Sequence, residues 1–162
     1  MLGVYPNRNA ASTLDFLERV RAGMPFPVQR IQTDRGGEFF AYEVQKRLQD
    51  WRIKLRPNRP RAPHLNGKVE RVQRTALEEF WPTASLKAPE LPDQIETWRR
   101  FYNQHRPHTS LGGKTPAERI RDLAEVIPSP EAIHAAYNPV KEIIRPQNTR
   151  RRWAPSTSTR VT

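Results

Sequence analysis

Two acidic residues of this sequence could together hold a divalent cation. Asp34 ends the segment VQRIQTD, and Glu70 lies within NGKVERVQRTALEEF. Metal-dependent phosphoryl transfer uses carboxylates from separate elements that converge on cations about 3.5–4 Å apart. An Asp that closes a buried strand and a Glu on a later helix can supply two such ligands. The pair therefore makes this a candidate site for metal-dependent phosphoryl transfer.

Each carboxylate also has a simpler interpretation. Asp34 meets the glycine-rich turn Asp34–Glu38, where ligand sites of α/β sheets gather, but an Asp there could merely cap the next helix. At 100° per residue, Glu70 falls at the rim of a stripe formed by Val69, Val72, Ala76 and Phe80. A carboxylate at the rim can reach a cleft, or it can pair with Arg74 one turn later in solvent.

Charge predicts a polyanionic partner. The 162 residues include 28 Lys and Arg against 17 Asp and Glu, a formal charge of +11. An excess of this kind is typical of nucleic-acid-binding proteins. The sequence has no cysteine and no long apolar run, so we expect neither disulfides nor a membrane segment. A cytosolic protein is expected.

The elements that position the carboxylates can be read from periodicity and caps. Strands are expected at 2–6, 24–34 and 52–57. Helices are expected at 9–23 (capped by Asn9 or Ser12), 36–51, 66–80, 93–107 (capped by Asp93) and from Thr115–Pro116 onward. This order predicts an α/β fold whose sheet is covered on both faces. Residues with aromatic side chains at helical spacing are assigned to the core: Trp51, Trp98, Phe101 and Tyr102.

Three segments in a fixed order resemble a known family. TDRGGEF, HLNGKVER and YNQHRPHTSLGGKTPAER are similar to motifs of the DDE transposase/integrase superfamily, as in bacterial insertion-sequence transposases. The resemblance covers Leu2 to Asp122 and implies an RNase H-like integrase catalytic core over 1–122. It implies that Asp34 and Glu70 hold Mg²⁺ or Mn²⁺ for DNA strand cleavage and strand transfer, in DNA integration, recombination and transposition.

The resemblance also implies a third carboxylate, which this sequence does not offer. The family's first Asp belongs on an earlier strand, whereas Asp15 is the single Asp before Asp34 and lies opposite the apolar stripe of its helix. We therefore expect an N-terminally truncated core whose own cleavage is impaired. Residues 123–162 are expected to form a basic, flexible extension with a disordered tail from Arg145.

DNA contact is expected around the start of the Glu70 helix. The resemblance implies that this loop and helix approach DNA, and phosphate contact needs cationic and polar side chains: Arg61, His64, Asn66, Lys68 and Arg74. His105 and His108 are assigned to loop packing rather than to a metal. Family members act as multimers, so a homo-oligomer or an assembly with full-length transposase is expected. The alternatives are a non-catalytic DNA-binding fragment that modulates such a transposase, or a decayed gene remnant.

Overall fold

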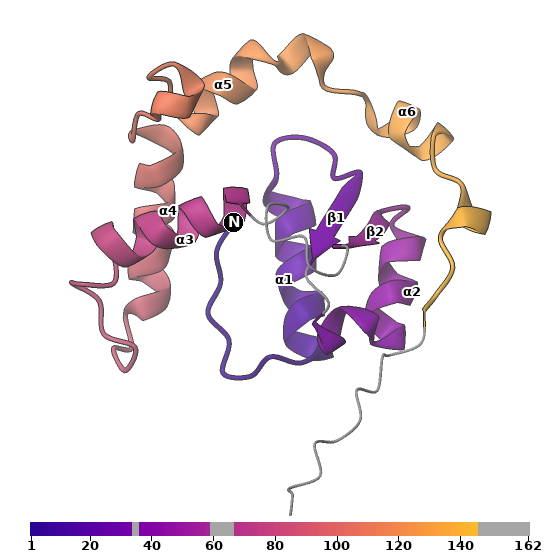
Figure 1. Ribbon diagram of the computed structural model, residues 1–162, viewed down its shortest axis with the longest axis horizontal. Helices are drawn as coiled ribbons and strands as arrows, with labels where there is room; N and C mark the ends of the chain where they lie inside the picture. Colours follow the sequence, from indigo (N-terminus) through magenta and orange to yellow (C-terminus); the bar gives the residue numbers. More distant parts are fainter. Residues whose placement is uncertain (34–35, 59–66, 146–162) are drawn as a thin grey trace, which may run out of the picture.

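The computed structural model describes residues 1–33, 36–58 and 67–145 (Figure 1). Its order is α1 (Ala10–Gly23), β1 (Arg30–Thr33), η1 (Gly37–Phe40), α2 (Tyr42–Asp50), β2 (Lys54–Pro57), α3 (Gly67–Glu79), α4 (Leu91–Gln104), η3 (Thr109–Leu111), α5 (Pro116–Asp122), η4 (Ala124–Val126), α6 (Pro130–Ala135) and η5 (Pro139–Lys141), where η denotes a 3-10 helix. No helix in these ranges is long and apolar enough to cross a membrane.

A parallel strand pair forms the centre of the first half. β1 and β2 pair with Arg30 opposite Lys54 and Gln32 opposite Arg56. Parallel neighbours need a crossover connection, and η1 with α2 supplies it. The carboxyl ends of both strands therefore lie at the same edge.

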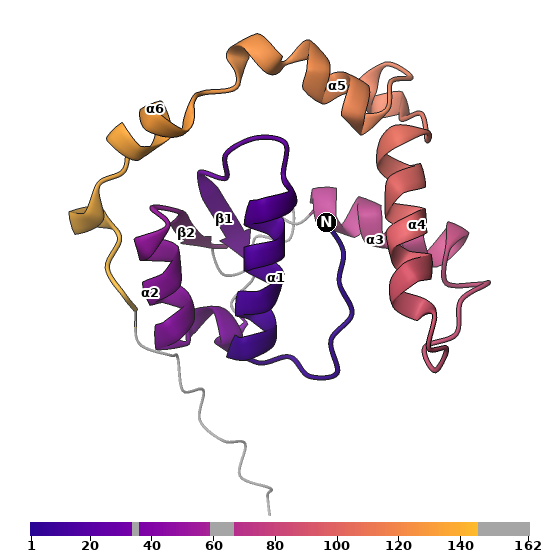
Figure 2. The same cartoon turned by 180° about the vertical axis from the view of Figure 1, so that it is seen from behind.

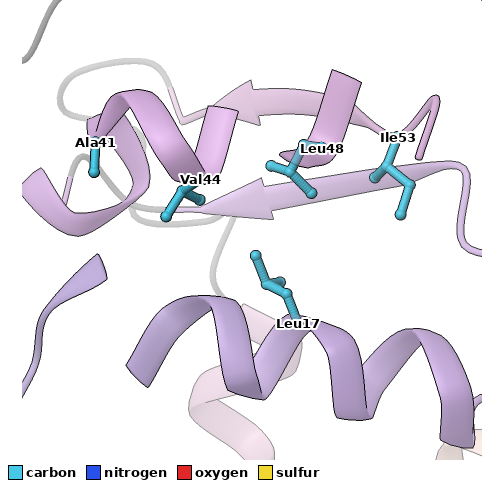
Figure 3. Close-up of a cluster of buried hydrophobic side chains, with 5 residues drawn as sticks. All are labelled: Leu17, Ala41, Val44, Leu48 and Ile53. Atoms are coloured by element: carbon cyan, nitrogen blue, oxygen red, sulfur yellow. The ribbon is translucent and has the colours of Figure 1, made fainter. Parts of the chain in front are cut away.

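One face of this strand pair carries the first apolar core. Leu17 from α1 packs with Ala41, Val44, Leu48 and Ile53, as Figure 3 shows. The register partners Ile31 and Leu55 pack against the same cluster. On the opposite face of β1, Arg30 and Gln32 are exposed. The prediction of a sheet covered on both faces is therefore wrong for the described residues.

A second core joins α3 to α4. Its buried members are Ala76, Phe80, Leu91, Ile95 and Trp98. Phe80 contacts the rings of Trp81 and Trp98, with centroids 5.0 Å and 5.9 Å away. From α4 the chain continues through α5 and α6 in an arc that ends beside α2, and Figures 1 and 2 show this arc from opposite sides.

Local capping signals were predicted correctly at two helices. The Asn9 side chain accepts a hydrogen bond from the Ser12 amide at the start of α1, and α1 ends at the predicted Gly23. Thr115 and Glu118 form a reciprocal capping box at α5, with Pro116 in its first turn. Such signals depend on residues one turn apart, so the sequence contains all the information needed.

Other predicted elements need correction. Residues 2–6 form no strand; Tyr5 instead packs on Phe16 and its hydroxyl donates to Asp15 at 2.5 Å. The helix expected at 36–51 is split at Ala41, whose ψ of 137° is extended. Gln45 Nε2 donates to the Phe40 carbonyl left open by this break.

The predictions for α4 were also inaccurate at its ends. The helix begins at Leu91 and ends at Gln104, so Asp93 lies in the first turn and is not the cap. Trp98 is buried and Tyr102 is half-buried, as expected for core residues, but Phe101 is 47% exposed. Phe101 follows Trp98 by three positions yet faces outward, so its helical spacing did not identify its exposure.

Candidate functional site

The shared carboxyl edge of β1 and β2 is where the Asp34 segment begins. β1 ends at the buried Thr33, whose carbonyl accepts a hydrogen bond from the Asn58 amide at 2.8 Å. The side chains of Gln32 and Asn58 add a bond of 2.6 Å. Because the strands are parallel, the chain leaves toward Asp34 and toward the basic segment 59–66 from one edge. Asp34, Arg61, His64 and Asn66 themselves lie outside the described residues.

Glu70 projects from the first turn of α3 and is exposed. The ion pair with Arg74 that the sequence left open is not formed. Among the described residues, no hydrogen-bond or ion-pair partner is found for the Glu70 carboxylate. A carboxylate in this state keeps all its oxygen lone pairs available for a cation.

The second half of α3 positions this first turn. Ala76 and Phe80 are buried against α4, as the predicted stripe requires. Val69, at the other end of the stripe, is 57% exposed and was wrongly placed in the core. At that end, Val69 borders a surface groove with Leu2 and Trp98 and is not a buried member of the α3–α4 core.

The motif YNQHRPHTSLGGKTPAER braces α3 against α4 and α5. Arg106 donates from Nε and Nη2 to the Glu79 carboxylate at 2.7–3.0 Å, which joins the end of α3 to the loop just after α4. This bonding raises the pKa of the Arg106 guanidinium. Gly112 and Gly113 adopt φ values of 65° and 82°, a left-handed turn that glycine enters without strain.

His108 packs as the sequence analysis expected. Its ring lies edge-on to Tyr102, with centroids 4.6 Å apart, and its Nε2 lies 3.3 Å from the Tyr102 carbonyl. Burial of the Tyr102 ring raises the pKa of its hydroxyl. These contacts assign His108 to holding the loop after α4.

A cationic groove lies beside α3. Lys68 and Arg74 are exposed on this helix, consistent with a surface role. Lys68 also lines a groove of about 670 Å³ together with residues from α3 and the loop after α4, among them Arg71, Thr75, His108, Thr109 and Ser110. Sequence reasoning assigned no role to Arg71. Its position three residues after Lys68 could have indicated a role, because this spacing places both cations on one face of the helix.

The described residues do not complete a metal centre by themselves. They include no group of three His, Cys, Asp or Glu side chains close enough to share an ion. Asp15 is exposed on α1 and its carboxylate accepts the Tyr5 hydroxyl, so its position does not favour a role as the third ligand. Glu70 has the donor chemistry that Mg²⁺ prefers, and Asp34 is its only predicted partner.

Comparison with known proteins shows that part of the chain is similar to integrases. Residues 51–116, which contain Glu70 and the brace, match the integrase core domain model. The chain is 35% identical over 92 residues to an uncharacterized 39.2 kDa protein of insertion element IS476 from Xanthomonas euvesicatoria. It is 30% identical over 110 residues to the ORF3 protein, a candidate integrase, of Spiroplasma virus SpV1-C74. These matches cover 54% and 60% of this chain but 26% and 30% of the relatives.

The fold agrees with a solved integrase structure. The catalytic core domain of BIV integrase superposes with a TM-score of 0.58 at 20% identity, covering 76% of this chain and 78% of that one. The fold is therefore that of an RNase H-like integrase core. Together, the integrase core domain match over residues 51–116 and the two relatives support the predicted resemblance to the DDE transposase/integrase superfamily. The predicted fold class is confirmed.

Proposed function

We propose that this chain takes part in DNA integration or transposition, binding DNA at the start of α3 and at the adjoining segment 59–66. The observation that carries the proposal is Glu70. It is exposed, has no ion-pair partner among the described residues, and lies in the segment that matches the integrase core domain. Lys68 and Arg74 flank it on the same helix, where they can contact phosphates. Arg61, His64 and Asn66 belong to the same proposal.

We also propose that Asp34 and Glu70 are the chain's two metal ligands. Mg²⁺ or Mn²⁺ bound there would activate water or a DNA 3′-hydroxyl for attack on a phosphodiester. The residues of the chain supply two carboxylates of the family's three, since Asp15 does not fit the remaining position. Strand cleavage by this chain is therefore expected to be weak unless another chain in an oligomer, such as a full-length transposase, provides the third.

A DNA-binding experiment tests the first part. Replacing both Lys68 and Arg74 with Gln should weaken binding to duplex DNA about equally for unrelated sequences. It should lower the slope of log affinity against log salt by about 2, because each phosphate contact contributes about 0.9. Fluorescence anisotropy with a labelled duplex over a series of salt concentrations measures both quantities.

The matched control replaces Lys87, in the turn between α3 and α4, and Arg121, on α5, with Gln; both are exposed and together carry the same charge. This double variant should lose only the small part of its DNA affinity that depends on net charge. Equal losses in the two double variants would show that binding depends on net charge and would contradict an interface on α3.

A cleavage experiment tests the second part. The purified chain should bind a supercoiled plasmid but nick it slowly or not at all in Mg²⁺ or Mn²⁺. Robust nicking that the Asp34→Asn substitution abolishes would contradict the missing-carboxylate argument and would establish an independent enzyme. If nicking remains absent while DNA binding is retained, the alternative of a non-catalytic DNA-binding fragment is favoured. A cooperative thermal melt would count against a decayed remnant that does not fold.

A further inference from the structure

The face of the strand pair that lies opposite the Leu17 core is basic. Side chains alternate between faces along a strand, so Arg30 and Gln32 of β1 share this face with Lys54 and Arg56 of β2. The register sets Arg30 directly opposite Lys54 and Gln32 opposite Arg56. Like charges in opposed positions destabilise a sheet unless an anion lies near them. Within the described ranges, no carboxylate pairs with Arg30 or Lys54.

A segment from the far end of the described chain lies beside β2 and α2 and contacts two of these cations. We call residues 136–145 the C-terminal strap. The Ala136 carbonyl accepts a hydrogen bond from Lys54 Nζ at 3.2 Å. Gln45 on α2 binds the Arg145 backbone in both directions, with bonds of 2.6 Å to its carbonyl and 2.7 Å from its amide. Gln49 donates to the Glu142 carbonyl. The strap therefore runs along β2 and α2, as the end of the arc in Figure 1 shows.

The central contact of the strap is an ion pair between Glu142 and Arg56. The two Arg56 terminal nitrogens donate to the two carboxylate oxygens at 2.6 Å and 2.5 Å. The Glu142 side chain is 7% exposed, whereas that of Arg56 is 43% exposed. This parallel pair of bonds is the geometry in which arginine also binds a phosphate group. Glu142 thus occupies the place that a phosphate oxygen pair would take on Arg56.

The apolar side chains in and just before the strap differ in how deeply they are buried. Ile133 in α6, just before it, is buried and lines a pocket with Val28, Trp51 and Ile53. Within the strap, Val140 is 80% exposed and Ile143 is 74% exposed. Ile144, by contrast, is half-buried and lines a pocket with Leu48, Ile53 and Leu55. Displacement of the strap would therefore break its polar contacts and uncover apolar surface at Ile144, while α6 could keep its position through Ile133.

We propose that Arg30, Lys54 and Arg56 form a second contact surface for the DNA backbone, and that Glu142 blocks Arg56 until DNA displaces the strap. The proposal rests on the proposed function, because it takes DNA as the ligand. DNA is the polyanion favoured by the position of these cations, since β2 leads directly into the basic segment 59–66. A long polyanion can contact Arg30, Lys54 and Arg56 together, whereas a small anion cannot.

The test is to remove the charge of Glu142 while keeping its shape. Glu142→Gln should raise the affinity for duplex DNA about fivefold at low salt, the value expected when a competing, partly exposed ion pair is lost. The matched control Glu125→Gln makes the same change of net charge on the exposed η4 and should have a much smaller effect. Adding Arg56→Gln to Glu142→Gln should remove the gain.

Two further measurements separate competition from general loosening of the structure. Arg30 is exposed, so Arg30→Gln should leave the thermal midpoint unchanged yet lower the salt slope of DNA binding by about 1. In hydrogen exchange, the Arg145 amide should lose protection when DNA is added, because its acceptor Gln45 Oε1 is released. The amides of α3 should keep theirs.

The outcomes distinguish this proposal from the proposed function. If the wild-type chain binds DNA through Lys68 and Arg74, but Glu142→Gln has no more effect than Glu125→Gln, the strap proposal is overturned and the proposed function stands. Unchanged Arg145 protection at saturating DNA would overturn the strap proposal as well. If neither the wild type nor Glu142→Gln binds DNA, both proposals are overturned.

Discussion

Replacing Phe80 with alanine should lower the free energy of unfolding by about 3–5 kcal/mol, the cost typical of removing a buried aromatic side chain. Phe80 is 7% exposed and its ring touches those of Trp81 and Trp98. It is the largest buried side chain that α3 or its immediate continuation contributes to the α3–α4 core. Urea unfolding followed by tryptophan fluorescence measures the change, because Trp81 and Trp98 report on this core.

The same substitution should also affect function. Without the Phe80 side chain, α3 should pack less tightly on α4. Glu70, Lys68 and Arg74 should then no longer keep a fixed position relative to α4. We expect weaker DNA binding at temperatures where the remaining structure is still folded.

Phe101 provides the matched control. It lies on α4 and is 47% exposed, so Phe101→Ala should change stability by less than about 1 kcal/mol. Equal effects of the two substitutions would mean that the α3–α4 core is not packed as described, and that Phe101 belongs to the core as its sequence spacing suggested.

Leu48→Ala should destabilise the other half of the protein by about 2–5 kcal/mol. Leu48 is 1% exposed and Val44, one turn before it, is 0% exposed, so their packing leaves almost no water contact. The cluster around them joins α1 and α2 to the strand pair. Hydrogen exchange of the β1 and β2 amides, together with the denaturant midpoint, measures the loss.

Leu77→Ala is the control for Leu48→Ala, since Leu77 on α3 is 64% exposed. It should change stability by less than about 0.5 kcal/mol, as surface substitutions usually do. A large effect of Leu77→Ala would reveal a partner surface on α3 that covers this side chain.

The sequence predicts the local parts of this fold well. The caps of α1 and α5 and the buried face of α2 follow from residues within one or two turns, where the physics is local. Errors arise where a distant segment decides the outcome. The exposure of Val69 and Phe101 depends on where α4 and α3 cross, and helical periodicity does not encode that crossing.

Polar contacts between residues far apart in the sequence could not be predicted from the sequence. Arg56 and Glu142 are 86 positions apart, and neither has a neighbouring pattern that identifies its partner. The segment after Val126 has weak periodicity because its short helix α6 is anchored by little more than Ile133. Its binding to α2 is carried by glutamine side chains, which hydropathy patterns do not detect.

The candidate site could be predicted in part. The angle of 100° per residue placed Glu70 at the edge of the apolar stripe of its helix, and the exposure of Glu70 agrees with that placement. The assignment of Asp34, Arg61, His64 and Asn66 stays a prediction. Arg71 was missed because the angular argument was centred on the apolar stripe, whereas the groove beside α3 is formed by the loop after α4.

The contacts that hold α3 in place are concentrated at its C-terminal end. Phe80 and the Glu79–Arg106 contact fix its last turn, while residues 67–71 at the other end are all exposed. Glu70 lies nine residues before Glu79, about 14 Å along the axis from the fixed end. A small change in the tilt of α3 about its last turn therefore moves the Glu70 carboxylate further than it moves residues near Glu79.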